Sequence, residues 1–316
     1  MIATATQPAL EVTGLRKSYG DTVALDGIDL RVAPGTVFAL LGPNGAGKTT
    51  AVQILSTLID ADAGDVRIDG HDAARDATAV RRVIGVTGQF SAVDSLLTGE
   101  ENLSLIADLC HLERTAGRRR IAALLERFEL ADAAARPAAT YSGGMRRRLD
   151  LAMTLVGDPR IIFLDEPTTG LDPRSRRAVW EIVRDLVRSG VTSFLTTHYL
   201  EEADQLADRV AVLDRGRLVA EGSPEELKRL IPGGSIGLEF ADAGALALAA
   251  GAFPEATRDE DAMTLRVPSD GGPDALRRIL DRIDRAAVQV ERISLHSPDL
   301  DEVFLSLTDA TGGART

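Results

Sequence analysis

The chain has 316 residues, of which 44% are hydrophobic and only 4% aromatic, so it can bury a large aliphatic core and exceeds the usual single-core size. Its 48 acidic residues outnumber the 36 basic ones, which gives a formal net charge of -12. A surface of that sign repels phosphate backbones and anionic lipid, so nucleic acid is not expected as a partner.

Local features narrow the class further. The arginine runs 118–120 and 146–148 are expected to be solvated helix faces. Cys110 is the only cysteine, so no intrachain disulfide can form. Residues 1–10 lack the basic and apolar regions of a signal peptide, and no stretch approaches the roughly 20 apolar residues that span a bilayer. We therefore do not expect this chain to carry a solute across a membrane alone.

The first 230 residues predict an α/β core with a mostly parallel sheet. A turn precedes an apolar run at 37–41, and an amphipathic segment at 48–58 follows a glycine-rich stretch, which is the strand, loop and helix order of a nucleotide-binding unit. Continuous apolar runs indicate strands that are covered on both faces. Further runs of this kind lie at 83–87, 161–164, 192–197 and 209–213.

Between these strands the periodicity becomes helical. Over 95–158 the apolar residues recur at helical spacing, as at Ile121, Leu124, Leu125 and Phe128. We interpret this stretch as a helical subdomain, at about 90–158, inserted into a domain that spans 10–231.

A second, smaller domain is predicted at 235–316. The pattern breaks at Ile231-Pro232-Gly233-Gly234. The segments after this break fit a ferredoxin-like βαββαβ order: strand 235–240, an Ala/Leu helix, strand 262–267, helix 273–285 and strand 288–295. A last helix opens at Ser297-Pro298. Its apolar stripe consists of Leu300, Val303, Phe304 and Leu307.

The glycine-rich stretch matches the phosphate-loop pattern G-x-x-x-x-G-K-[ST]. Its residues are Gly42, Pro43, Asn44, Gly45, Ala46, Gly47, Lys48 and Thr49, with Thr50 next in the helix. Backbone N–H groups converge on phosphates in such a loop, and the helix N-terminus adds positive potential. Lys48 would bridge the β- and γ-phosphates, and the Thr49 hydroxyl would ligate Mg²⁺. A chance glycine-rich turn is the alternative, but the flanking strand and helix favour the phosphate loop.

Two carboxylates, Asp165 and Glu166, end the apolar strand at 161–164. Alone, such an ending is common in proteins. Paired with a phosphate loop, it predicts that Asp165 holds Mg²⁺ through water and that Glu166 polarises the attacking water as general base.

Tyr141-Ser142-Gly143-Gly144-Met145 begins a helix, and its hydroxyl and amides form an anion-binding N-terminus. With the phosphate loop upstream and Asp165-Glu166 downstream, this segment resembles the signature motif of ATP-binding cassette (ABC) ATPases. The usual form is LSGGQ, so Tyr141 and Met145 depart from it, while the phosphate-contacting Ser and Gly atoms remain.

The resemblance covers residues 10–230 and implies further roles. Gln89 is similar to the Q-loop glutamine, which senses Mg²⁺ and the attacking water and links the site to the membrane subunit. Asp172 resembles the D-loop aspartate, His198 the switch histidine on the γ-phosphate, and Tyr19 the aromatic that stacks on adenine. For Tyr19 and Gln89 a structural role is the alternative.

Three segments resemble the daunorubicin-resistance type of exporter ATPase within that family: 96–103, 141–145 and 300–308. The resemblance implies a head-to-tail homodimer in which Ser142 and Gly144 of one copy close on MgATP held by the other. It also implies a separately encoded membrane permease, efflux of a hydrophobic, drug-like compound, and a place on the cytoplasmic face of the cell membrane. An importer ATPase, a lipid or polysaccharide exporter ATPase, and a soluble cassette ATPase are the alternatives.

Overall fold

The computed structural model describes residues 7–88, 92–230, 234–269, 272–296 and 299–312. The chain forms two compact units, Met1–Pro224 and Glu225–Thr316, and each is described by itself. Among the described residues, no helix has the length and apolar character needed to cross a membrane.

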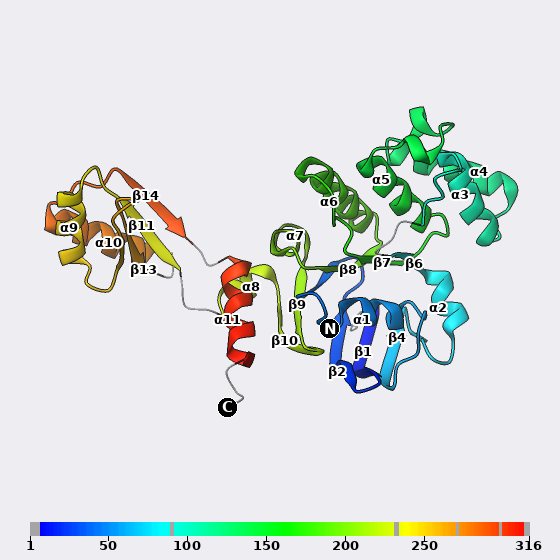
Figure 1. Ribbon diagram of the computed structural model, residues 1–316, viewed down its shortest axis with the longest axis horizontal. Helices are drawn as coiled ribbons and strands as arrows, with labels where there is room; N and C mark the ends of the chain where they lie inside the picture. The colour runs from blue at the N-terminus through cyan, green and yellow to red at the C-terminus, as the bar shows by residue number, and fades with distance from the viewer. Residues whose placement is uncertain (1–6, 89–91, 231–233, 270–271, 297–298, 313–316) are drawn as a thin grey trace, which may run out of the picture. The chain divides into compact units, whose positions relative to one another are not determined.

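A six-stranded sheet forms the centre of the first unit (Figure 1). Its order is β10-β9-β3-β8-β7-β6, and all neighbours are parallel except β10, which is antiparallel to β9. The strands are β3 (Val37–Leu41), β6 (Ile84–Thr87), β7 (Ile161–Asp165), β8 (Thr192–Thr197), β9 (Arg209–Asp214) and β10 (Arg217–Gly222). Every residue of β3, β7 and β8 is buried, which confirms the α/β prediction made from the continuous apolar runs.

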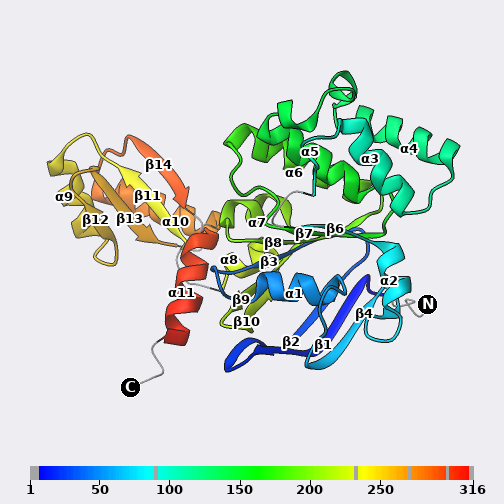
Figure 2. The ribbon, with the colours of Figure 1, turned by 45° about the vertical axis from the view of Figure 1, so that its right-hand side comes forward.

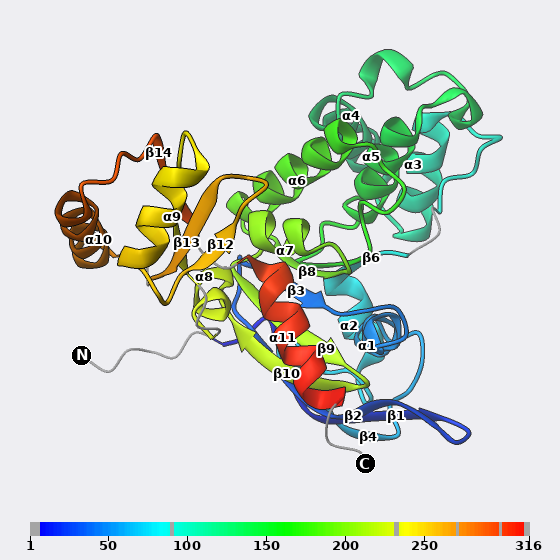
Figure 3. The same ribbon diagram turned by 60° about the vertical axis from the view of Figure 1, so that its left-hand side comes forward.

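The predicted helical insertion lies between β6 and β7. Its helices are α3 (Gly99–Leu109), α4 (Arg114–Arg127) and α5 (Gly143–Thr154), with short 3-10 turns at Ala131–Ala133 and Ala138–Thr140. Figure 3 shows the three helices grouped side by side. Thr98 and Glu101 form a reciprocal capping box that fixes the start of α3. Figure 2 shows this group and α6 (Pro173–Arg188) on the opposite side of the large sheet from α1 (Lys48–Leu55).

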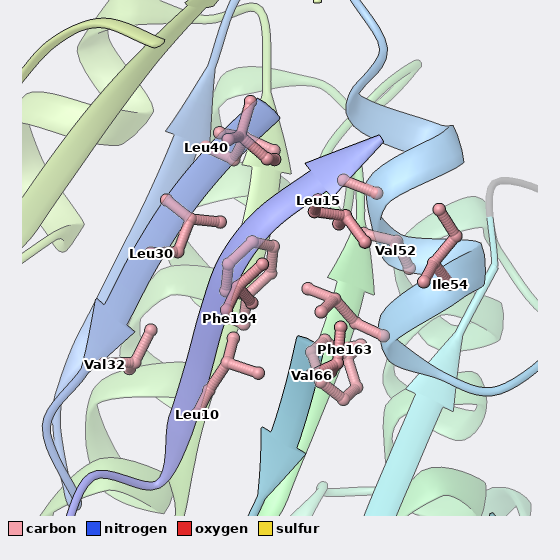
Figure 4. Packing of buried hydrophobic residues seen from close by; sticks show 14 of the residues in the cluster. Leu10, Leu15, Leu30, Val32, Leu40, Val52, Ile54, Val66, Phe163 and Phe194 are labelled. Atoms are coloured by element: carbon pink, nitrogen blue, oxygen red, sulfur yellow. The ribbon is translucent and has the colours of Figure 1, made fainter. Parts of the chain in front are cut away.

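A second, antiparallel sheet of the same unit was not predicted. Its order is β2-β1-β4-β5, with β1 (Leu10–Tyr19), β2 (Thr22–Val32), β4 (Ala63–Ile68) and β5 (His71–Asp72), and α2 (Ala77–Val83) follows it. Figure 4 shows Val52 and Ile54 of α1 packed between this sheet and the large one. Because α1 carries the phosphate loop at its start, this shared core holds the loop in place.

The second unit is ferredoxin-like, as predicted. Its sheet order is β12-β13-β11-β14, all antiparallel, and its chain order is β11 α9 β12 β13 α10 β14. The apolar face of the sheet packs against the two helices (Figure 3). The elements are α8 (Pro224–Lys228, at the boundary), β11 (Ser235–Glu239), α9 (Ala243–Ala252), β12 (Thr257–Asp259), β13 (Thr264–Pro268), α10 (Pro273–Ala286), β14 (Arg292–His296) and α11 (Leu300–Gly312). In the last helix Leu300 and Val303 are buried, whereas Ser297-Pro298 lies outside the described residues.

Candidate active site

The phosphate loop joins β3 to α1 and depends on glycine at both of its ends. A Cβ atom on Gly42 would lie 2.3 Å from the carbonyl oxygen of Leu213, and one on Gly47 would lie 2.4 Å from that of Ala24. Gly47 also has φ 110°, a conformation that residues with side chains rarely adopt. The loop is therefore packed against β9 and β2 so tightly that only glycine fits.

Lys48 is the first residue of α1, and its side chain is buried beneath the loop. Its ammonium donates to the carbonyl oxygens of Gly42 at 2.8 Å and Pro43 at 3.1 Å, and lies 3.5 Å from Oε1 of Glu166. Burial lowers the pKa of Lys48, although Glu166 and Asp165 act against that shift. The lysine thus lies between the phosphate loop and the acidic end of β7.

Asp165 and Glu166 lie at the carboxyl end of β7, beside the phosphate loop. The Asp165 carboxylate is buried and accepts a 2.5 Å hydrogen bond from the Thr196 hydroxyl. The backbone N–H of Glu166 donates to that same hydroxyl oxygen at 3.0 Å. Glu166 has φ 48°, and a left-handed residue at the end of a strand is the kind of backbone strain that concentrates at functional sites.

Three groups surround the Glu166 carboxylate. Nδ1 of His198 lies 3.2 Å from Oε1, within hydrogen-bond distance when that nitrogen carries a proton, and the Thr169 hydroxyl donates to Oε2 at 3.2 Å. Burial alone would raise the pKa of Glu166. His198, Lys48 and Thr169 outweigh it and hold the pKa below its ordinary value, so this carboxylate is charged near neutral pH.

The Ser142 segment is built as a capped helix start. The Ser142 hydroxyl accepts from the Met145 N–H at 3.2 Å, and Ser142 and Gly143 are exposed. Tyr141 instead points into the helical subdomain, where its hydroxyl donates to the Ala133 carbonyl at 2.7 Å. Tyr141 therefore supports the motif from inside, and the exposed groups are those that follow it.

Asp172 caps the start of α6, and its hydrogen-bond partner Ser175 lies close to the Ser142 segment. Its carboxylate accepts from the N–H groups of Arg174 and Ser175 and from the Ser175 hydroxyl at 2.6 Å. These bonds lower the pKa of Asp172, and the bond from the Ser175 hydroxyl contributes most. A Cβ on Gly144 would lie 3.0 Å from that hydroxyl, so the starts of α5 and α6 approach each other within one chain.

Two predicted site residues remain, Tyr19 and Gln89. Tyr19 ends β1 with half of its surface exposed, and the Lys17 ammonium lies 5.7 Å from its ring centroid. Gln89 lies outside the described residues.

The expectation for the arginine run at 146–148 was wrong. Arg146 donates to backbone carbonyls, Arg148 pairs with Glu129, and Arg147 is only 11% exposed beside a buried Asp150.

Sequence reasoning also missed several supporting residues. Thr196 and Thr169 orient the two carboxylates described above. Glu202 of α7 (Leu200–Leu206) is fully buried and accepts from the Thr168 hydroxyl at 2.8 Å and the Trp180 indole at 2.9 Å. Only their places in the sequence could have pointed to these threonines: Thr168 and Thr169 follow Glu166, and Thr196 precedes His198 by two residues.

A groove of about 800 Å³ lies between the end of α2 with β6 and the helical subdomain. One wall carries Arg81 and Arg82, and the other carries Leu109 and the only cysteine, Cys110. Its lining includes Ala92, the first described residue after Gln89. Leu109 is 67% exposed, so the groove presents apolar and basic surface close to Ala92.

A phosphate loop facing the Asp165-Glu166 pair, in a mostly parallel sheet interrupted by helices, defines a nucleoside triphosphatase. Comparison with known proteins makes this class specific. Residues 25–169 match the family model described as ABC transporter, and residues 222–308 match the model for the C-terminal domain of DrrA1-3-like ATP-binding proteins.

The relatives agree with both models. The daunorubicin resistance ATP-binding protein DrrA3 of Streptomyces coeruleorubidus is 51% identical, with 95% of this chain and 96% of the relative covered. The daunorubicin/doxorubicin resistance ATP-binding protein DrrA of Streptomyces peucetius is 47% identical over 96% and 94%. The Nod factor export ATP-binding protein I of Paraburkholderia xenovorans is 38% identical over 96% and 97%.

Solved structures agree on the fold. The ADP conformation of an ATP-binding cassette from an ABC transporter is 27% identical, with a TM-score of 0.64, and 70% of this chain and 93% of that chain are covered. The chain belongs to the ATP-binding cassette family of transporter ATPases, in its daunorubicin-resistance group. Its activity is accordingly the binding and hydrolysis of ATP as a transporter subunit.

Proposed function

We propose that this ATPase drives efflux of a hydrophobic, drug-like compound through a separate membrane subunit, by closing two copies of itself on MgATP. One observation carries the site assignment: the Glu166 carboxylate lies 3.2 Å from His198 and 3.5 Å from Lys48. A charged base, a cation and an imidazole thus meet at the phosphate loop, where a γ-phosphate and its attacking water would lie.

Each of these residues then has a distinct chemical role. Lys48 and the loop amides bind the β- and γ-phosphates, with Thr50 following in the same helix turn. Glu166 accepts the proton of the attacking water, and His198 contacts the γ-phosphate and orients the Glu166 carboxylate. Tyr19 supplies an exposed ring for adenine, and Gln89 and Asp172 complete the site.

The residues present fit Mg²⁺. The Thr49 hydroxyl, the buried Asp165 carboxylate and Gln89 are oxygen ligands, which Mg²⁺ prefers. Within the described ranges, no cluster of three or more His, Cys, Asp or Glu side chains could hold a metal, so phosphate oxygens and waters would complete the coordination. When bound, the ion neutralises charge that develops on the phosphates.

The second half of the site comes from another copy in this proposal. Ser142 and Gly143 are exposed at the start of α5, and a Cβ on Gly143 would meet nothing within 4 Å. An exposed helix N-terminus attracts a phosphate. A head-to-tail homodimer brings this end onto the nucleotide held by Lys48 of its twin.

The membrane partner would bind in the groove beside Ala92, at the cytoplasmic face of the cell membrane. Two features support this choice: the groove is lined by Ala92, three residues after Gln89 in the sequence, and it offers exposed Leu109 with Arg81 and Arg82. A short amphipathic helix with acidic residues would match that chemistry. Drug-like cargo is favoured over other exported compounds because the relatives named for daunorubicin or doxorubicin resistance match at 46–51% identity, including the C-terminal domain.

The proposed domain extents are 10–231 for the ABC domain, with its helical subdomain at about 90–158, and 235–316 for the accessory domain.

Substitution Glu166→Gln tests this function. The variant should retain MgATP, accumulate as an ATP-dependent dimer in analytical ultracentrifugation, and turn over roughly 10²- to 10⁴-fold more slowly. Glu129→Gln changes a carboxylate that is 83% exposed and serves as the control. Normal phosphate release by Glu166→Gln would remove Glu166 from its role, and a monomer with bound ATP would remove the two-copy mechanism.

A further inference from the structure

Arg147 and Asp150 form a buried ion pair on α5, the helix that begins at Ser142. Nη1 of Arg147 lies 2.9 Å from Oδ2 of Asp150, and the side chains are only 11% and 2% exposed. A buried ion pair contributes little net stability, because removing two charges from water is costly. The better-attested use of such a pair is to fix the register between parts of a structure.

Each member of the pair makes a second contact outside α5. Nε of Arg147 donates to the carbonyl oxygen of Pro167 at 2.6 Å, and Pro167 is the residue after Glu166. Oδ1 of Asp150 accepts from the backbone N–H of Ala92 at 3.0 Å, three residues after Gln89. The pair therefore ties the Ser142 helix to the residue after Glu166 on one side and to Ala92 on the other.

Carboxylates outside α5 also contribute to the electrostatic environment of Arg147. Burial lowers the pKa of Arg147, while Asp150, Glu202 and Asp165 act to raise it. Two of these carboxylates, Glu202 and Asp165, lie outside α5, so the electrostatic environment of Arg147 extends beyond its own helix.

We propose that Arg147 and Asp150 are positioning residues that link the placement of the Ser142 helix to the loop carrying Glu166 and to Ala92. They act through the Pro167 carbonyl and the Ala92 N–H. The guanidinium is planar and rigid, so a shift of the Pro167 carbonyl on nucleotide binding moves α5 with it. This inference rests on the proposed function, since it concerns how the Ser142 end is presented to a second copy.

The test uses the full chain in the Glu166→Gln background, where closed dimers accumulate. Arg147→Met removes the link, Arg147→Lys keeps the charge without the fork, and Asp150→Asn keeps an oxygen for the Ala92 N–H. The double variant R147M/D150N removes both charges, so no unpaired buried charge remains to destabilise the fold.

Arg120 provides a matched control. It also donates to a backbone carbonyl, that of Leu155 at 2.7 Å, and to a carboxylate, that of Asp158 at 2.8 Å. Arg120 and both of its acceptors lie between β6 and β7, so Arg120→Met breaks a similar cluster without touching the loop after Glu166.

Two readouts are needed. Sedimentation should show ATP-driven dimerisation weakened about tenfold or more by Arg147→Met and by the double variant, partly rescued in Arg147→Lys, and unaffected by Arg120→Met. MgATP affinity of the dilute monomer should stay within about twofold in all of them, since phosphate contacts are unchanged. Hydrogen exchange in the first turn of α5 should respond to MgATP in the parent monomer and not in Arg147→Met.

The outcomes separate the two claims. A parent that binds ATP without dimerising contradicts the proposed function, and the hydrogen-exchange comparison still decides the linkage within one copy. Equal dimerisation by the parent and the double variant, equal damage from Arg120→Met, or an unchanged exchange response in Arg147→Met overturns the linkage.

Discussion

The ammonium of Lys48 lies 3.5 Å from the carboxylate of Glu166, across the gap between the phosphate loop and the end of β7. Both side chains are largely buried, with 5% and 10% of their surfaces exposed. The ammonium also donates to the loop carbonyls of Gly42 and Pro43. The same charges are available to a γ-phosphate and its attacking water when ATP enters.

Replacing Lys48 should remove the charge that binds the phosphates. We expect Lys48→Ala to lower turnover by at least about 10²-fold, and Lys48→Arg to fail as well, because a planar guanidinium does not fit a buried site shaped for an ammonium. Titration with a fluorescent ATP analogue and a phosphate-release assay measure both effects. Lys228→Ala, in the second unit, is the control, and equal loss in that variant would argue against a specific role for Lys48.

A methyl group at Gly47 should damage the loop through geometry alone. Gly47→Ala places a Cβ 2.4 Å from the Ala24 carbonyl at φ 110°, so we expect a loss of at least about 1–3 kcal/mol of stability together with loss of ATP binding. Gly251→Ala lies in α9 with open space around it and should stabilise the chain by up to about 1 kcal/mol. Chemical denaturation compares the two, and equal stability changes would contradict this account.

Substitutions of the proposed magnesium ligands should have graded effects. Thr49→Ser keeps a hydroxyl and should retain hydrolysis. Thr49→Ala and Asp165→Asn should instead weaken the apparent affinity for Mg²⁺ by roughly 10- to 100-fold. Chelation with EDTA should stop hydrolysis in every variant. The measurement is turnover against Mg²⁺ concentration at fixed ATP, and a Thr49→Ala curve that overlays the parent would exclude Thr49 as a ligand.

The single cysteine reports on the proposed membrane interface without engineering. Cys110 lines the groove with Leu109 and Arg81, so maleimide should label it in the isolated chain and about tenfold more slowly in the complex with the membrane subunit. Burial raises the pKa of the Cys110 thiol, so less reactive thiolate is present at neutral pH and labelling should speed up as pH rises. A cysteine placed at exposed Glu129 in a Cys110→Ser chain is the control. Equal labelling of Cys110 in both states would place the partner elsewhere.

Local patterns were sufficient to predict the parallel sheet and its motifs. The phosphate loop, the Asp165-Glu166 strand end and the capped start at Ser142 are each encoded by a few adjacent residues. The antiparallel sheet was missed because bulges break its alternation. Gly14 and Gly27 adopt left-handed φ angles near register shifts in the β1–β2 pair, so Leu10, Val12 and Leu15 do not keep a period of two.

Contacts distant in sequence could not be predicted. Arg147 was expected to face solvent because an arginine run usually does, yet its acceptor on Pro167 lies 20 residues away. The burial of Tyr141 depends on Ala133 and on a bare Gly99, whose Cβ would lie 2.3 Å from the tyrosine hydroxyl. Such partners are set by how α5 packs, and a single sequence does not specify that packing.

The central claim is that one nucleotide is bound between the phosphate loop of one copy and the Ser142 helix start of another. The test mixes two variants of the chain, both without Cys110. One carries Asn44→Cys and the other carries Gly143→Cys, and both positions are exposed. An oxidant should join them as a heterodimer that is abundant with MgATP and scarce without it. A cross-link that ignores nucleotide, or none at all with MgATP bound, would contradict the account.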